Sequence, residues 1–162
     1  MSCRIVIEGR LPRGIGVDRA ALRRAAAHFA AKAEARARVP FREVAVVLQD
    51  DAFSAVTHAA INGADGPTDV TTQRYDAMPG EVDGVYGELY VNAERALAAA
   101  PRRRGWSAAK ELLLYIAHGM DHLSGADDHT PRGYAAMRRR ELAWLRAADR
   151  ILGSMCEVEK PL

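Results

Sequence analysis

The sequence predicts a protein of the α+β class, with strands in the first two-thirds of the chain and helices toward the end. The segments rich in β-branched and alternating apolar residues all lie before Ala93. From Ala93 onward the chain is rich in alanine, leucine and arginine, which favour helices, and shows no further strand pattern. Because the sequence contains neither an internal repeat nor a linker, we expect a single domain over residues 1–162.

Four short segments have the composition of β-strands. The first has three β-branched residues between two charged ones, and the second is a compact apolar run. The third contains three threonines and one valine, all β-branched, and a turn-forming segment around Pro79, Gly80 and Gly84 separates it from the fourth. We therefore expect strands over residues 4–8, 44–48, 68–75 and 87–92.

Five helices are predicted from capping residues and from apolar residues at helical spacing. Asp18 is placed to cap the first helix and Pro40 follows its end, while Asp50 or Asp51 can cap the second. Thr130 can cap the last helix, in which Pro131 occupies the first turn. The expected helices cover residues 19–38, 51–58, 93–100, 107–123 and 131–152.

Three of the five histidines lie within twelve residues, at His118, His122 and His129. His118 and His122 are four positions apart in a helical segment, so their side chains share one face of the helix. Gly125 allows the chain to turn back, which can bring His129 to the same metal ion. Three protein ligands leave a fourth position for water, as in catalytic zinc sites. The alternative is a chance pair of histidines on a helix surface.

The residue after His118 decides between two kinds of metal chemistry. Zinc peptidases of the HExxH type carry their general base, a glutamate, directly after the first histidine. Gly119 occupies that place here, so peptidase chemistry lacks its proton acceptor.

Composition adds little about partners but bears on the compartment. The net charge is +2 and hydrophobic residues make up 49% of the chain, as in ordinary globular proteins. Cys3 and Cys156 lie at opposite ends, which suits a reducing compartment more than a disulfide framework. The N-terminus does not resemble a signal peptide, and no apolar run approaches the roughly 20 residues of a membrane span. We expect a cytoplasmic protein that does not associate with membranes.

Three motifs, taken in order, resemble those of the YbeY family of metal-dependent endoribonucleases, which mature 16S rRNA. The family's HGxLHLxGYDH signature is matched by HGMDHLSGADDH at residues 118–129. Its TDVLSF-like strand is matched by PTDVTTQ at residues 67–73, and its GDIVIS-like strand by GELYVNAERA at residues 87–96. The resemblance covers roughly residues 45 to 140, and the first 40 residues match only in outline.

The resemblance implies a central mixed sheet of about four strands, covered by helices, with the HxxxH helix near the C-terminal end. It also implies one Zn²⁺ per chain in a cleft beside the sheet, held by His118, His122 and His129. One additional residue precedes His129, so Asp128 lies at the family's ligand spacing while His129 has the family's ligand identity. We favour His129 on ligand type, with Asp128 as the alternative third ligand. Asp127 or Asp128 would then orient a histidine by accepting its second N–H.

Two other departures from the family pattern concern charge. The arginine that the family often carries before the TDV strand is replaced by Asn62, so phosphate activation would depend on another arginine, such as Arg74 or Arg95. Asp121 replaces an apolar residue between the two helical histidines, and we expect it to form a surface salt bridge.

The activity implied is that of a single-strand-specific, zinc-dependent endoribonuclease in 16S rRNA 3′-end maturation and ribosome quality control. His118 and His122 would act through a metal-bound water, whose pKa zinc lowers toward about 7. The candidates for binding RNA are Arg95, Arg138, Arg139 and Arg140, with the run Arg102–Arg104 as a second cluster. The expected partners are rRNA and the small ribosomal subunit, and the expected state is a monomer. A non-catalytic, zinc-stabilised assembly factor and a metallopeptidase are the alternatives.

Overall fold

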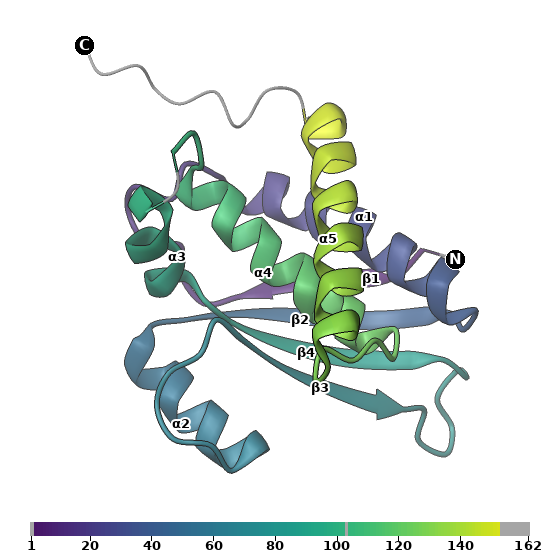
Figure 1. Cartoon of the computed structure of the whole chain (residues 1–162). Coiled ribbons are helices and arrows are strands. Elements are labelled where there is room, and N and C mark those ends of the chain that lie inside the picture. Colours follow the sequence, from purple (N-terminus) through teal and green to yellow (C-terminus); the bar gives the residue numbers. More distant parts are fainter. Residues whose placement is uncertain (1, 103, 153–162) are drawn as a thin grey trace.

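A computed structural model describes residues 2–102 and 104–152 of the chain (Figure 1). Its centre is a four-stranded sheet in the order β1-β2-β4-β3, formed by β1 (Arg4–Glu8), β2 (Phe41–Gln49), β3 (Val70–Asp76) and β4 (Val85–Asn92). β1, β2 and β4 are parallel to one another, whereas β3 pairs antiparallel with β4 at the edge. The predicted α+β class and the mixed sheet of four strands are confirmed.

The described residues form five α-helices in the predicted order: α1 (Arg19–Ala37), α2 (Asp51–Asn62), α3 (Ala93–Ala99), α4 (Ala108–Leu123) and α5 (Pro131–Leu152). A 3₁₀ turn, η1 (Ala100–Arg102), follows α3. The predicted caps are present, because the side chains of Asp18, Asp50 and Thr130 accept backbone N–H groups three residues ahead. α2 continues four residues beyond its predicted end at His58, until Gly63 closes it in the left-handed conformation (φ 65°).

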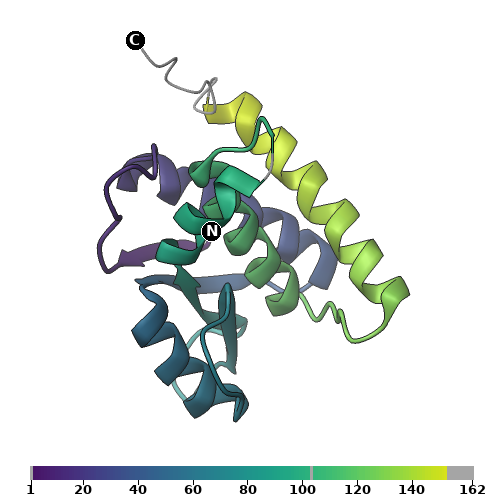
Figure 2. The same cartoon turned by 60° about the vertical axis from the view of Figure 1, so that its left-hand side comes forward.

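The helices cover the two faces of the sheet unequally. In Figures 1 and 2, α1, α4 and α5 lie on one face and α2 on the other. The side chains of β2 and β4 that point toward α1 and α4 are buried, namely Val44, Val46, Leu48, Val85, Leu89 and Val91. α4 contacts α1, α3, α5, β3 and β4, which explains why its sequence is an almost continuous apolar run. Among the described residues, no helix is both long and apolar enough to cross a bilayer.

α4 packs closely on the sheet, and glycines occupy both sides of the contact. A Cβ atom at Gly119 would lie 2.8 Å from Cδ2 of Leu89, and one at Gly87 would lie 2.6 Å from Cδ1 of Leu123. Neither position can accept a side chain without displacing its neighbour. This close approach fixes the C-terminal half of α4, which carries both helical histidines, against β4 and β3.

A buried ion pair joins α5 to the same half of α4. Asp121 is fully buried, and its carboxylate accepts hydrogen bonds from Nε (2.9 Å) and Nη2 (2.8 Å) of Arg140. Arg36 of α1 approaches the same carboxylate at 3.8 Å. The expectation of a surface salt bridge at Asp121 was therefore wrong, because α1 and α5 both pack over this part of α4 and enclose the carboxylate.

Candidate active site

His118 and His122 lie on one face of α4 with their Nε2 atoms 3.0 Å apart. The other ring nitrogen of each histidine has an acceptor within reach. Nδ1 of His118 lies 2.7 Å from Oε1 of Glu141, and Nδ1 of His122 lies 3.1 Å from the carbonyl oxygen of Ala126. A carboxylate and a carbonyl only accept hydrogen bonds, so both Nδ1 atoms carry the proton. Both Nε2 lone pairs are thus left for a shared cation.

Asp128 supplies the third group at this point. Its Oδ2 atom lies 3.5 Å from Nε2 of His118 and 3.7 Å from Nε2 of His122. In a tetrahedral site with metal–ligand bonds of about 2.0–2.1 Å, neighbouring ligand atoms are about 3.3 Å apart. The three separations match that spacing, so His118, His122 and Asp128 fit a divalent metal ion.

His129, favoured on ligand type as the third ligand, lies outside this group. Its side chain is 88% exposed, and its Nε2 lies 3.6 Å from Oδ1 of Asp127. The cause is the path of the loop after α4. Gly125 turns the chain back in the left-handed conformation (φ 92°), and this turn brings residue 128, not residue 129, to the histidine pair. The geometry therefore supports the alternative ligand, Asp128.

The carboxylate that orients His118 comes from α5. Glu141 is fully buried, and its Oε1 contacts the His118 ring 2.7 Å away. Burial lowers the pKa of His118, but the hydrogen bond and negative charge of Glu141, together with Asp69 and Asp128, raise it above its ordinary value. The same negative charges stabilise a cation bound to the ring. The sequence pattern assigns this orienting role to Asp127 or Asp128 and misses Glu141.

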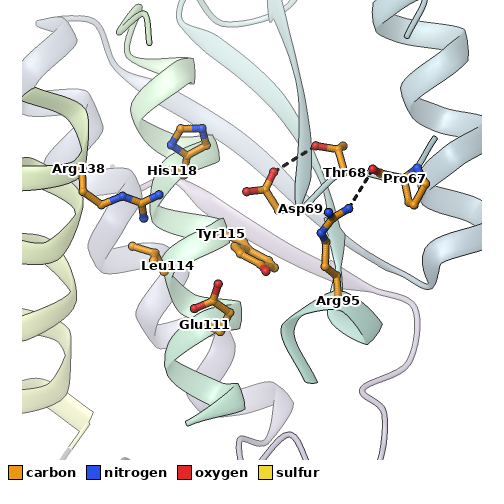
Figure 3. A pocket seen from close by; sticks show the side chains of 9 residues that line it. All are labelled: Pro67, Thr68, Asp69, Arg95, Glu111, Leu114, Tyr115, His118 and Arg138. Atoms are coloured by element: carbon orange, nitrogen blue, oxygen red, sulfur yellow. Dashed lines mark hydrogen bonds between the residues drawn. The ribbon is translucent and has the colours of Figure 1, made fainter. Parts of the chain in front are cut away.

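A pocket of about 280 Å³ opens beside His118 (Figure 3). It lies between α3, α4, α5 and the segment that enters β3. Its wall combines positive, negative and aromatic side chains, and is formed by Pro67, Thr68, Asp69, Arg95, Glu111, Leu114, Tyr115, His118 and Arg138. A polar cavity of this size next to a metal-binding group suits a small charged portion of a larger substrate.

Two of the four arginines proposed to bind RNA line this pocket. Arg95 donates from Nη1 to the carbonyl of Pro67 (2.9 Å), and Arg138 lies on the α5 side. Arg139 is exposed outside the pocket. The guanidinium of Arg140 donates hydrogen bonds to the carboxylate of Asp121 and therefore lies in the contact between α4 and α5.

Arg74 and Asn62 lie outside this pocket. Arg74 donates to the carbonyl of Leu123 at the end of α4 (2.9 Å). Asn62 is at the end of α2, on the opposite face of the sheet from α4 (Figure 1). In the run Arg102–Arg104, residue 103 lies outside the described residues. Of the two arginines considered as substitutes for the family residue, only Arg95 belongs to the pocket.

Gly119 gives a structural reason to set peptidase chemistry aside. A Cβ atom at this position would meet Cδ2 of Leu89 at 2.8 Å and Cγ2 of Val70 at 3.2 Å, and would therefore face β4 and β3. A glutamate there would point into the sheet and not toward the metal-binding group. The position therefore cannot provide the general base of an HExxH enzyme.

Comparisons with known proteins agree with these observations. Residues 15–149 match the model of a protein family described as "Endoribonuclease YbeY". A relative of that name from Rhodopirellula baltica is 39% identical over 101 residues, which cover 62% of this chain and 50% of the relative. Another from Anaeromyxobacter sp. is 31% identical over 143 residues, covering 88% of this chain and 70% of the relative. The match thus spans only half the length of the first of these relatives.

A solved structure has the same fold. The solution structure of TM1509 from Thermotoga maritima superposes with a TM-score of 0.58 at 24% identity, over 97% of each chain. The match to the family model reaches further toward the N-terminus than the three sequence motifs, since it includes the whole of α1.

Proposed function

Because the chain belongs to the endoribonuclease YbeY family, we propose that it cleaves phosphodiester bonds in single-stranded RNA with the help of a divalent metal ion. The observation that carries the proposal is the convergence of His118, His122 and Asp128 at one point beside a pocket lined by two arginines. Metal ligands and phosphate-binding groups are two components that metal-assisted phosphodiester hydrolysis uses.

We propose zinc as the metal, one ion per chain, held by His118, His122 and Asp128. A zinc ion in such a site supplies a water activated near neutral pH and polarises a phosphoryl oxygen. Glu141 fixes the ring of His118 through Nδ1, so that its Nε2 faces the other two ligands.

Arg95 and Arg138 are proposed to bind the phosphate group. A guanidinium offers paired N–H donors to two phosphate oxygens. The two arginines come from different helices, α3 and α5, and both line the pocket beside His118. They supply the positive charge that Asn62 does not provide.

The biological role that follows is maturation of the 3′ end of 16S rRNA and quality control of ribosomes. The partners are then rRNA and the small ribosomal subunit, and the compartment is the cytoplasm. The proposed working form is a monomer. The role in rRNA maturation is inferred from the family to which the chain belongs.

A second candidate is an assembly factor that binds RNA without cutting it, with the metal stabilising the loop after α4. The observation favouring it is Asn62, which replaces the family's arginine with a neutral side chain. Arg95 and Arg138 argue against it, since they return positive charge to the pocket.

The test measures metal content and RNA cleavage of the purified protein, using single-stranded and duplex RNA of the same sequence. The proposal expects about one metal ion per chain and cleavage of the single strand only. His122→Ala should lose both metal and cleavage, and casein should remain intact with either protein. Metal-loaded protein that binds single-stranded RNA and leaves it uncut would favour the assembly factor instead.

A further inference from the structure

One carboxylate of the pocket has no part in the function proposed so far. Asp69 directly precedes β3, and its backbone carbonyl accepts the N–H of Asn92 (2.8 Å), which ties the residue to β4. Its Oδ1 accepts hydrogen bonds from the N–H of Val70 (2.8 Å) and the hydroxyl of Thr68 (3.2 Å). Within the described part of the chain, Oδ2 has no hydrogen-bond partner. In Figure 3 the carboxylate projects into the pocket, between His118 and Arg95.

Hydrolysis needs a group that accepts a proton, because a water molecule that attacks phosphorus must lose one. The two histidines are not free for this task, since Nδ1 of each is hydrogen-bonded and Nε2 faces the metal position. Asp128 belongs to the metal-binding group, and Gly119 has no side chain.

The two other carboxylates near the pocket are also engaged. The Glu141 side chain is 1% exposed and holds the ring of His118 from behind. Glu111 is 5% exposed, and its Oε2 accepts the indole N–H of Trp106 at 2.6 Å. Asp69 is therefore the carboxylate of the pocket with an oxygen available to a substrate.

We propose that Asp69 is the proton-transfer residue of the reaction. As the water oxygen bonds to phosphorus, Oδ2 of Asp69 accepts the proton that the water loses. The bond from phosphorus to the leaving ribose oxygen then breaks, and the resulting carboxylic acid returns the proton to that oxygen. The cycle consumes one water and leaves Asp69 as a carboxylate. This inference rests on the proposed function.

The surroundings of Asp69 suit this task. The two donors on Oδ1 come from adjacent residues of its own segment, so they hold the carboxylate plane while leaving Oδ2 directed to the pocket. Arg95 and Arg138 line the same pocket, and their positive charges allow a phosphate to approach a carboxylate. The base thus comes from the edge of the sheet, whereas in HExxH enzymes it comes from the metal-binding helix.

The test compares Asp69→Asn with Asp65→Asn in the metal-loaded protein. Asparagine keeps the shape of the side chain and an oxygen that accepts both Oδ1 hydrogen bonds, but it cannot take the proton. Asp65 is an exposed residue in the same segment and lies outside the pocket, so it is the matched control. With zinc at saturating concentration, we expect kcat to fall about 100-fold or more in Asp69→Asn, with about one metal ion per chain, an unchanged Tm and no loss of RNA affinity. Asp65→Asn should cleave at the wild-type rate.

A second variant distinguishes proton transfer from a structural role. Asp69→Ala should regain part of its rate when sodium formate is added, because a small carboxylate can enter the pocket, whereas His122→Ala should not. A fall in kcat below tenfold in Asp69→Asn, loss of its metal, or absence of formate rescue in Asp69→Ala would each overturn the inference. None of these outcomes contradicts RNA cleavage by the wild-type protein, so the proposed function would still hold. Failure of the wild-type protein to cleave would refute the proposed function itself.

Discussion

Oε1 of Glu141 lies 2.7 Å from Nδ1 of His118, although the two residues are 23 positions apart and belong to different helices. This contact makes α5 part of the proposed metal site without giving it a metal ligand. The ring of His118 is fixed from behind by a buried carboxylate, and its Nε2 is thereby directed toward His122 and Asp128. α5 in turn is held on α4 by the ion pair between Arg140 and Asp121.

Replacing Glu141 by glutamine should weaken metal binding about 10- to 100-fold. Glutamine can still accept the N–H of His118 through its oxygen, but the negative charge that stabilises a cation at the ring is lost. The zinc dissociation constant, measured by competition with a chromophoric chelator, checks this. Glu8→Gln, on an exposed position of β1, is the control. Equal zinc affinity in the two variants would show that the charge of Glu141 does not contribute to metal binding.

The ion pair of Asp121 and Arg140 should behave as a buried pair in stability measurements. Arg140→Leu leaves the carboxylate of Asp121 buried with the hydroxyl of Ser124 (3.2 Å) and the more distant Arg36 (3.8 Å), and should reduce the free energy of unfolding by about 3 kcal/mol. The double variant Asp121→Leu/Arg140→Leu should recover most of that loss, since two apolar side chains replace the pair. Urea denaturation of both, with exposed Arg139→Leu as control, measures the effect. A loss below about 1 kcal/mol in Arg140→Leu would contradict the buried pair.

Arg95 and Arg138 should account for a measurable part of the RNA affinity. Arg95→Gln and Arg138→Gln should each weaken binding of a single-stranded RNA and reduce the slope of log Kd against log salt by about 1. Arg139→Gln, one residue further along α5 and outside the pocket, should leave the slope unchanged. Fluorescence anisotropy over a series of salt concentrations gives these slopes. If Arg139→Gln had the largest effect, the RNA would run over the outer face of α5 and not through the pocket.

Cys3 should react slowly with alkylating reagents in the folded protein. Burial, followed by the charges of Glu34 and Glu43, raises the pKa of its thiol to about 11 from 9.0. A raised pKa means less thiolate at a given pH, so at pH 8 the reactive fraction falls about 100-fold. The rate at which iodoacetamide labels Cys3 is measured in a Cys156→Ser variant, once in the folded protein and once in urea. Equal labelling rates in the two conditions would show that folding does not protect the thiol.

The elements of the fold follow from local signals and could be predicted from the sequence. The caps of α1, α2 and α5 are polar side chains three residues before the N–H that they accept, so both partners are visible in the same short segment. The histidine pair on α4 is of the same kind, since i and i+4 spacing on a helix is enough to place both rings together.

The rest of the site depends on contacts between distant segments. Glu141 occupies a position of α5 whose neighbours along the buried face are Met137, Leu145 and Ala148. An acid at such a place indicates a buried partner, but the sequence does not identify His118 as that partner. Whether Asp128 or His129 faces the two histidines depends on the turn at Gly125. If that loop were one residue shorter, His129 would take the place that Asp128 occupies.

The proposed ligand set is tested most directly by comparing Asp128→Ala with His129→Ala in zinc-dependent cleavage of a single-stranded RNA. We expect His129→Ala to cleave within about twofold of the wild-type rate, because the side chain of His129 is 88% exposed and lies outside the group formed by His118, His122 and Asp128. We expect Asp128→Ala to lose activity at least about 100-fold, together with its zinc. Full activity in Asp128→Ala and its loss in His129→Ala would contradict the proposed ligand set.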